Sequence, residues 1–494
     1  MRELLRAVFK TGIGSSASMV LSAVSSKLMA AVSGPFGIGL YSLIQQLTQT
    51  VSASGLAGGG RTVMAQGIAS REGKDRDSFI LAAFWILTFG AILASSALIL
   101  SAPWIAPLIF GSNDGATVGL VRWTALPVVL TIALVYLNGV LNGFMAIGRL
   151  AIIQVVGAAA NALLSYPISV MVNTGYPVAF VAMTTISLLA QVMVGFSKAY
   201  RQGYLHPIVA NRFRIRIEKQ ASRSFFIVAG TFMIGSVVAS VCLLSIRALI
   251  VQHSGIGEAG IFNVAWVICV VYPTVVLNSF AAYYLPKLSQ TKDVQERSDL
   301  MNKVFRLTMI IIVPLELLAM VLKPLMINVL YSEEFYPSLL MLRWMIVGIF
   351  LRVTAQTFAM PMLSSADMKT FFWTGNLQYI SLVGFSLLSI VYYGGLEVIG
   401  IGYVAIHGGY MVYSLHYATS KHGYIVQPRL MAAWFVGLAL IVAASVSTWH
   451  DTSVNMMVTL GFLAAGILYV TLSTTKQERN KTKELLVQAL SSKR

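Results

Sequence analysis

The stretch FILAAFWILTFGAILASSALILS, residues Phe79–Ser101, contains 23 residues and no charged side chain. An α-helix needs about 20 apolar residues to cross the hydrocarbon core of a bilayer, so this segment predicts a transmembrane helix. It is one of many such runs, because hydrophobic residues make up 57% of the 494 positions and charged residues only 11%. The sequence therefore predicts an all-α integral membrane protein.

Apolar runs separated by polar or charged segments predict about fourteen transmembrane helices. We place them at residues 11–33, 37–68, 79–101, 117–144, 150–172, 177–198, 224–250, 259–286, 304–323, 337–362, 370–393, 398–418, 429–448 and 454–473.

The basic residues are distributed unevenly between the connecting segments. The chain carries 35 Lys and Arg against 18 Asp and Glu, a net charge of +17. Most of the cations fall in every second connection, and the intervening connections are short and nearly free of them. Cytoplasmic loops of membrane proteins are enriched in Lys and Arg, so the basic connections and both termini are predicted to be cytoplasmic. This distribution accounts for the charge without nucleic acid as a partner.

Two halves of the chain resemble each other at one constant offset in residue number. Gly39-Leu-Tyr41 corresponds to Gly260-Ile-Phe262, and Arg122-Trp123 corresponds to Arg343-Trp344. Transporters built from such repeats bind substrate between them and work by alternating access. We therefore predict two pseudo-symmetric six-helix lobes with two extra C-terminal helices. The predicted divisions are an N-terminal lobe at 1–200, a cytoplasmic basic linker at 201–223, a C-terminal lobe at 224–420, and a segment at 421–494 with the last two helices and a basic tail.

Seven cations fall inside predicted helices or at their outer ends. A cation in hydrocarbon costs at least about 2.5–3.5 kcal/mol, so it is normally paired, reaches the headgroups, or lines a wet cavity. Because few acidic residues lie near them, we predict a cavity for an anion. Its candidate residues are Lys27, Arg61, Arg247 and Arg352, whereas Arg122, Lys323 and Arg343 are interpreted as interfacial anchors.

The acidic residue well inside a helix is Glu316, after Pro314. It is predicted either to pair with a buried cation or to carry a coupling proton. Uncharged polar residues in the predicted helices, among them Gln45, Gln46, Gln49, Gln154, Asn161 and Asn263, are predicted to line a passage wide enough for a sugar.

Motifs of catalysis are not found. The six histidines lack zinc spacing, no Gly-Lys-Ser/Thr phosphate loop is present, and Cys242 and Cys269 lie in predicted membrane helices. We therefore expect a transporter without its own nucleotidase, not an enzyme, with no metal or cofactor.

Several segments resemble a known family. Lys27–Gln46, which contains Gly34-Pro-Phe-Gly-Ile-Gly-Leu-Tyr41, is similar to the start of Wzx-type O-antigen and common-antigen flippases. Further similar segments are Gly257–Phe262, Leu277–Phe280 and Tyr284–Leu288. These flippases form the polysaccharide-transporter branch of the multidrug/oligosaccharidyl-lipid/polysaccharide exporter superfamily.

The resemblance implies two lobes around a central cationic cavity in the bacterial inner membrane. It further implies that the chain moves an undecaprenyl-diphosphate-linked oligosaccharide, such as an O-antigen repeat unit, from the inner to the outer leaflet. Lys27 and Arg247 match basic positions of the family's first and seventh helices, and Arg352 matches one in the tenth. A polysaccharide polymerase and other assembly proteins are the partners that it implies, besides membrane lipids.

Two other transport functions share this architecture. A lipid II flippase would have the same cationic cavity and fourteen helices. A cation-coupled multidrug exporter would need several buried carboxylates for the drug and the coupling ion, whereas this chain offers Glu316. A membrane scaffold is disfavoured because buried unpaired cations would bring it no advantage.

Overall fold

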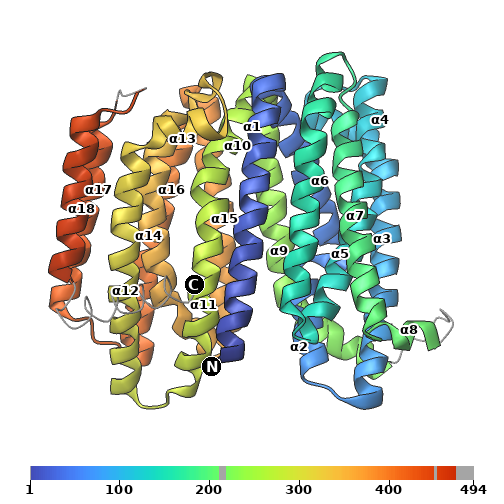
Figure 1. Cartoon of the computed structure of the whole chain (residues 1–494), viewed down its shortest axis with the longest axis horizontal. Coiled ribbons are helices and arrows are strands. Elements are labelled where there is room, and N and C mark those ends of the chain that lie inside the picture. The colour runs from blue at the N-terminus through green and yellow to red at the C-terminus, as the bar shows by residue number, and fades with distance from the viewer. Residues whose placement is uncertain (1, 211–218, 450–452, 474–494) are drawn as a thin grey trace, which may run out of the picture. The chain divides into compact units, whose positions relative to one another are not determined.

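The computed structural model describes residues 2–210, 219–449 and 453–473, and the regular elements in these ranges are all helical (Figure 1). The α-helices are α1 (Arg2–Ser52), α2 (Gly60–Ala69), α3 (Gly73–Phe110), α4 (Gly115–Trp123), α5 (Ala125–Gly143), α6 (Ile147–Asn173), α7 (Ala179–Arg201), α8 (His206–Ala210), α9 (Lys219–Ser254), α10 (Ile256–Trp266), α11 (Tyr272–Gln290), α12 (Val294–Val321), α13 (Lys323–Leu330), α14 (Ser338–Ser364), α15 (Met368–Leu387), α16 (Glu397–His422), α17 (Pro428–Ser447) and α18 (Met456–Ser473). Short π-helical segments η1 (Ala53–Ala57), η2 (Val267–Val271) and η4 (Leu388–Tyr393) and the 3₁₀ turn η3 (Glu333–Phe335) connect some of them.

Thirteen segments of the described residues are long and apolar enough to cross a membrane. The first of them, Ser16–Ala69, has 54 residues, more than twice the length of about 20 that one crossing needs. It covers the two helices predicted at 11–33 and 37–68, and the backbone leaves the helical conformation between them at Gly34. The predicted all-α membrane fold is confirmed, and the predicted helices 429–448 and 454–473 correspond to α17 and α18.

The chain forms two compact units. Unit 1 comprises Met1–Val264, Val329–Phe335 and Gly375–Gly394, and unit 2 comprises Ala265–Asn328, Tyr336–Thr374 and Gly395–Arg494. This division differs from the predicted boundaries at 200 and 224, because α9 packs against α1 and α3. The predicted domains remain a prediction; residues 211–218 of the predicted linker and the basic tail from Lys476 lie outside the described residues.

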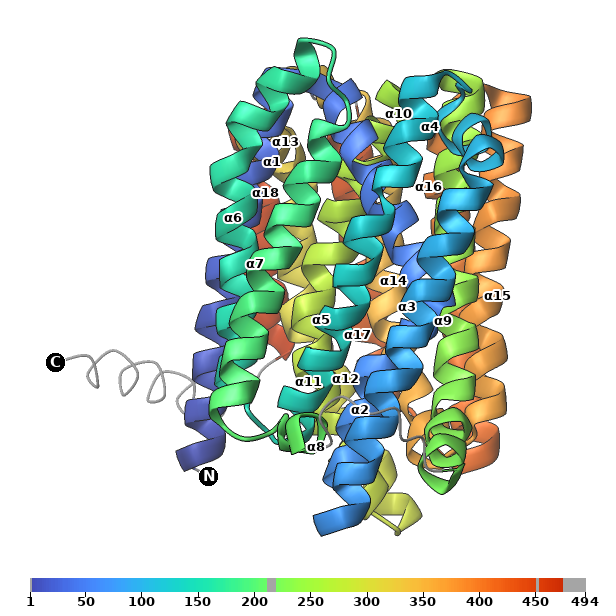
Figure 2. The same cartoon turned by 90° about the vertical axis from the view of Figure 1, so that its right-hand side faces the viewer.

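Most of unit 1 comes from the first half of the sequence, and its long helices lie side by side (Figure 2). Helix α6 packs along α1 and α7, while α3 packs along α5 and α9. The packed faces are lined by large apolar side chains such as Leu43, Phe79 and Phe180, each at most 1% exposed. Burial of these side chains positions the polar groups described below.

Three basic connections meet at one end of unit 1, beside α8 (Figure 2). The guanidinium of Arg76 lies 4.9 Å from the ring centroid of Phe144, which stacks on Tyr204 at 4.0 Å. Arg149 donates a hydrogen bond to the Tyr204 hydroxyl at 3.4 Å. These contacts place the basic connections on one side, as a cytoplasmic assignment requires; the assignment itself stays a prediction.

In unit 2, α14 is buried along most of its length. It packs along α16 and α12, and α12 in turn packs along α17 and α18. The Arg306 guanidinium donates two hydrogen bonds, at 3.0 and 2.7 Å, to the Ser473 carbonyl at the end of α18. The two C-terminal helices are therefore packed on unit 2 through α12.

The sequence repeat appears in the backbone as two matching helix breaks. Gly34 interrupts α1 with φ of +56°, and Gly255 separates α9 from α10 with φ of +91°. Both values lie in the left-handed region, which glycine adopts at little cost because it has no Cβ. Gly34 and Gly255 are equivalent positions of the sequence repeat, since the same offset relates Gly39 to Gly260.

Just after these breaks, the two repeats cross backbone to backbone. A Cβ added at Gly39 would overlap the Ile256 carbonyl oxygen, and a Cβ added at Gly260 would overlap the Pro35 carbonyl oxygen. Pro35 and Ile256 are equivalent positions of the repeat, as are Gly39 and Gly260. The contact is therefore reciprocal, as at a two-fold axis. We call these four residues the glycine crossing.

We predict that Gly39→Val destabilises the protein, because the new side chain cannot be accommodated without moving two backbones apart. Overpacking of this kind costs about 1–3 kcal/mol. The thermal midpoint of the purified chain should fall by several degrees. Gly257→Ala is the matched control, since its Cβ would lie 3.8 Å from the Pro35 Cβ, an ordinary contact. Equal midpoints for the two variants would contradict a close crossing.

Candidate functional site

Arg247 is a buried cation held by uncharged partners. Its side chain, on α9, is 4% exposed. The guanidinium donates to the Gln46 Oε1 at 3.3 Å and to the Asn263 Oδ1 at 3.1 Å, and it lies 5.4 Å from the ring centroid of Phe262. The Arg247 Nε has no hydrogen-bond partner among the described residues. Two amide oxygens therefore orient the guanidinium without neutralising it.

Gln46 is itself fixed to α9. Its Nε2 donates to the Ser240 carbonyl at 3.2 Å, and the Thr50 hydroxyl donates to the same carbonyl at 3.0 Å. The polar face of α1 after the glycine crossing therefore binds both the backbone of α9 and its buried arginine. These hydrogen bonds satisfy groups that would be costly to bury without partners.

Arg343, in contrast, is a buried cation whose charge is neutralised by a carboxylate. It is 3% exposed, and it donates to the Glu397 carboxylate at 2.7 Å and to the Trp449 carbonyl at 3.1 Å. The Trp449 ring lies 3.5 Å from the guanidinium carbon. Among the residues whose side chains are described, Arg343 is the cation of the predicted helices that is found in an ion pair with a carboxylate. Arg343 is thus buried by structural contacts, not exposed at an interface as the sequence suggested.

Lys323 is buried in a similar way, at 1% exposed, and donates to the Thr448 carbonyl and hydroxyl at 2.8 and 2.6 Å. Arg122, by contrast, is exposed beside an exposed Trp123, as expected of an interfacial anchor.

The other three predicted site cations lie in different surroundings. Lys27, half-buried on α1, donates through Nζ to the Tyr331 carbonyl. Arg61 is exposed on the first turn of α2, directly after the helix break at η1, where Gly59 has φ of +69°. Arg352, half-buried on α14, donates to the Tyr403 hydroxyl at 3.2 Å. These partners of Lys27 and Arg352 are uncharged oxygens.

Glu316, on α12, is 4% exposed. Among the residues whose side chains the structure describes, no ion-pair partner of this carboxylate is found. Its two predicted roles, an ion pair or a coupling proton, stay predictions.

The structure assigns the predicted residues to both units. Lys27, Arg61 and Arg247 belong to unit 1, whereas Arg352 and Glu316 belong to unit 2. Within unit 1, Arg247 and Lys27 are held by separate sets of partners. The role of all five in one binding cavity is therefore taken up as a proposal below.

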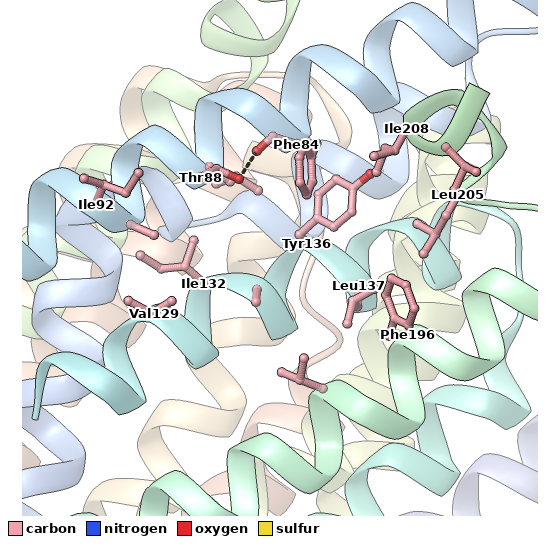
Figure 3. Close-up of a pocket in the computed structure, with 15 residues that line it drawn as sticks. Phe84, Thr88, Ile92, Val129, Ile132, Tyr136, Leu137, Phe196, Leu205 and Ile208 are labelled. Atoms are coloured by element: carbon pink, nitrogen blue, oxygen red, sulfur yellow. Dashed lines mark hydrogen bonds between the residues drawn. The ribbon is translucent and has the colours of Figure 1, made fainter. Parts of the chain in front are cut away.

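Unit 1 contains a cavity of about 240 Å³ with an apolar lining (Figure 3). It is enclosed by α3, α5, α7 and α8, with Phe84, Ile132 and Phe196 among its walls. The two hydroxyls at its wall donate to backbone carbonyls, Thr88 to Phe84 at 2.7 Å and Tyr136 to Ile80 at 3.4 Å. Its walls therefore suit a hydrocarbon chain.

A second cavity in unit 1, of about 200 Å³, is polar. It lies among α1, α5, α6 and α7, and nine of its ten lining residues carry uncharged hydrogen-bonding side chains. Gln45, Gln49 and Asn161 were among the polar positions selected from sequence; the others include Thr131, Ser187 and Gln191. Sequence reasoning missed these because isolated Ser, Thr and Gln residues in a membrane helix usually bond to their own backbone or to a neighbouring helix. The signal that could have found them is a polar stripe, Thr184, Ser187 and Gln191, at helical spacing on α7.

Comparisons with known proteins agree on one family for this chain. Residues 35–340 match the family model described as polysaccharide biosynthesis protein. The lipid III flippases of Escherichia coli (strain K12) and Shigella flexneri are each 24% identical to the chain over 380 residues, covering 75% of this chain and 87% of theirs.

Solved structures share the fold. A lipid II flippase, MurJ, has a TM-score of 0.70 at 13% identity, covering 96% of this chain and 99% of that chain. A transporter of the MOP superfamily from Pyrococcus furiosus has a TM-score of 0.62 at 14% identity, covering 85% and 95%. At these identities the likeness establishes the fold alone.

We predict that Glu397→Gln destabilises the protein without affecting transport directly, because it leaves the Arg343 charge buried without a counter-charge. The loss should be about 1 kcal/mol, since Glu397 is 37% exposed and water screens the pair. The thermal midpoint of the purified chain measures it. Glu296→Gln, at an exposed carboxylate of α12, is the control. A midpoint equal to that of the control would contradict a structural role for this pair.

Proposed function

This chain belongs to the polysaccharide biosynthesis protein family, and we propose that it is a flippase for a lipid-linked oligosaccharide. Membership confirms the resemblance first seen in Lys27–Gln46. The specific cargo we propose is an undecaprenyl-diphosphate-linked glycan such as an O-antigen repeat unit, carried from the inner to the outer leaflet. The relatives named lipid III flippases support a lipid-linked cargo.

The observation that carries the proposal is the uncompensated charge of Arg247. A guanidinium at 4% exposure normally has a carboxylate partner, as Arg343 does. Arg247 instead has two amide oxygens, and a diphosphate would supply the negative charge that these lack. Arginine suits this role because its planar fork of N–H donors matches phosphate oxygens.

Transport in this proposal requires a conformational step. Because Arg247 is buried, a diphosphate reaches the guanidinium only when α9 separates from part of its present surroundings. Alternating access would provide such a step, and the two repeats of the chain are the feature on which it commonly rests. Lys27, Arg61 and Arg352 would add positive charge along the same route, with Glu316 as an ion-pair or coupling group.

The remaining attributes follow from this proposal. The chain is a multi-pass membrane protein, and we place it in the bacterial inner membrane with both termini in the cytoplasm. Cargo released on the outer leaflet would pass to a polysaccharide polymerase or other assembly protein. The apolar cavity of Figure 3 offers a surface for a hydrocarbon chain in the same unit.

Two related functions remain as competing outcomes of the test. A lipid II flippase would differ in the sugar and peptide portion of the cargo, which the mass of the lipid reveals. A cation-coupled multidrug exporter would need carboxylates to bind its cationic drugs. The polar cavity of unit 1 is lined by no charged residue, which favours a glycan over a cationic drug.

We predict that Lys27→Ala and Arg247→Ala each reduce flipping by at least about tenfold, because removing one partner of a buried charge pair costs about 2–5 kcal/mol of binding. Arg247→Lys should retain partial activity, since it keeps the charge but loses the fork geometry. The measurement is the amount of undecaprenyl-diphosphate glycan that accumulates on the inner leaflet of a host expressing each variant, quantified by mass spectrometry.

Arg122→Ala is the control for these variants, because it removes an exposed cation from the end of a predicted helix. It should leave the lipid pool at the level of the unaltered protein. Full activity in the Lys27→Ala, Arg247→Ala double variant would exclude both residues from diphosphate binding. An unchanged lipid pool together with new sensitivity to cationic drugs, after depletion of the protein, would favour the exporter.

A further inference from the structure

We propose that the polar cavity of unit 1 is a neutral subsite that binds one sugar ring of the glycan, separate from the cations that bind the diphosphate. This inference rests on the proposed function, because it identifies which part of the lipid-linked cargo the cavity takes. It begins from a contrast within the unit: cations lie on α1, α2 and α9, whereas the cavity among α1, α5, α6 and α7 has no charged lining residue.

The cavity presents mainly hydrogen-bond acceptors. The hydroxyls of Thr48, Thr184 and Ser187 donate their protons to backbone carbonyls, at 2.8, 2.9 and 3.0 Å, which leaves oxygen lone pairs for a ligand. The Asn161 Oδ1 is buried and has no partner among the described residues. A buried acceptor without a partner is costly, so a donor from a ligand or water is expected there.

Donors are also available to a ligand at two points. The Tyr41 hydroxyl accepts a hydrogen bond from the Gln45 Nε2 at 2.6 Å, so its own proton remains free to donate. Gln191 donates weakly to the Ser187 carbonyl at 3.3 Å, and its amide has further hydrogen-bonding capacity. A ligand with several hydroxyls, each both donor and acceptor, matches this mixture. An anion or a cation does not, because no lining residue carries the opposite charge.

The dimensions of the cavity limit it to a small ligand. Its volume of about 200 Å³ corresponds to about seven water molecules, since each occupies about 30 Å³ in the liquid. This is room for one sugar ring and not for a whole oligosaccharide. The cavity would therefore bind one sugar of the oligosaccharide repeat unit.

Gly157 sets the position of Gln191 in this cavity. A Cβ added at Gly157 would overlap the side-chain amide of Gln191, which lies directly against the α6 backbone. A larger residue at position 157 would push this amide into the cavity. Gly157→Ala therefore changes the cavity without removing any polar group, and it provides a second, independent variant.

The two repeats differ at one position that lines the subsite. Tyr41 corresponds to Phe262 at the offset that relates Gly39 to Gly260. Tyr41 contributes a hydroxyl to the polar cavity, while Phe262, which has none, presents its ring to the Arg247 guanidinium. At equivalent positions of the two repeats, Tyr41 thus lines a neutral cavity and Phe262 contacts a charged group.

The test measures binding of free monosaccharides and of inorganic pyrophosphate to the purified full-length chain in detergent. Saturation-transfer difference NMR with N-acetylglucosamine, N-acetylgalactosamine, glucose, galactose and rhamnose gives the sugar affinity, and isothermal titration calorimetry gives that of pyrophosphate. We expect at least one sugar to bind. Asn161→Leu, through the loss of one hydrogen bond, and Gly157→Ala, through displacement of the Gln191 amide, should each weaken it by about tenfold, with pyrophosphate binding unchanged.

Tyr166→Leu is the matched control, because Tyr166 lies on the same helix, α6, with an exposed side chain that does not line the cavity. It should leave sugar binding unchanged. Binding of no sugar by the unaltered chain, or equal affinities for Asn161→Leu, Gly157→Ala and Tyr166→Leu, would overturn the subsite while leaving the flippase proposal standing. Sugar binding that depends on Asn161, in a chain that moves no lipid-linked glycan, would support the subsite and refute the flippase.

Discussion

The close approach of two glycines determines the arrangement of the polar groups in unit 1. At the glycine crossing, the backbone after Gly34 touches the backbone after Gly255, and no side chain separates them. Tyr41 and Gln45 follow within two turns of Gly39 and line the polar cavity. Asn263 follows one turn after Gly260 and accepts from Arg247. The polar cavity and the buried cation Arg247 are therefore positioned by the same contact.

The electrostatic character of the protein follows from which partners its cations have. Arg343 and Lys323 are buried with a carboxylate or with carbonyl and hydroxyl oxygens, and they fasten helices of unit 2. Arg247 is equally buried but is oriented by amides, which leave its charge available to an anion. In a low-dielectric interior a charge left without a counter-charge is costly, so a site that retains one is a candidate for binding. The proposed diphosphate site rests on this difference.

The sequence was informative where a pattern has one physical cause. Long apolar runs predict membrane helices because the bilayer sets their length, and the repeat of Gly39-Leu-Tyr41 at Gly260-Ile-Phe262 marked the two segments that meet at the glycine crossing. The sequence does not show which side chains contact each buried cation. Arg343 and Arg247 look alike in sequence, and only the fold shows that Glu397, 54 positions away, neutralises the first. The polar cavity was likewise visible only in part, because Thr131 and Gln191 lie on helices distant in sequence.

The central claim is that the buried arginine recognises the diphosphate of a lipid-linked glycan. The most direct measurement uses the purified chain in proteoliposomes with two fluorescent polyprenyl lipids that carry the same glycan, one through a diphosphate and the other through a monophosphate. The claim predicts that the diphosphate lipid crosses faster and that Arg247→Gln, which removes the charge, abolishes the difference. Equal rates for the two lipids with the unaltered chain, or a difference that survives Arg247→Gln, would contradict it.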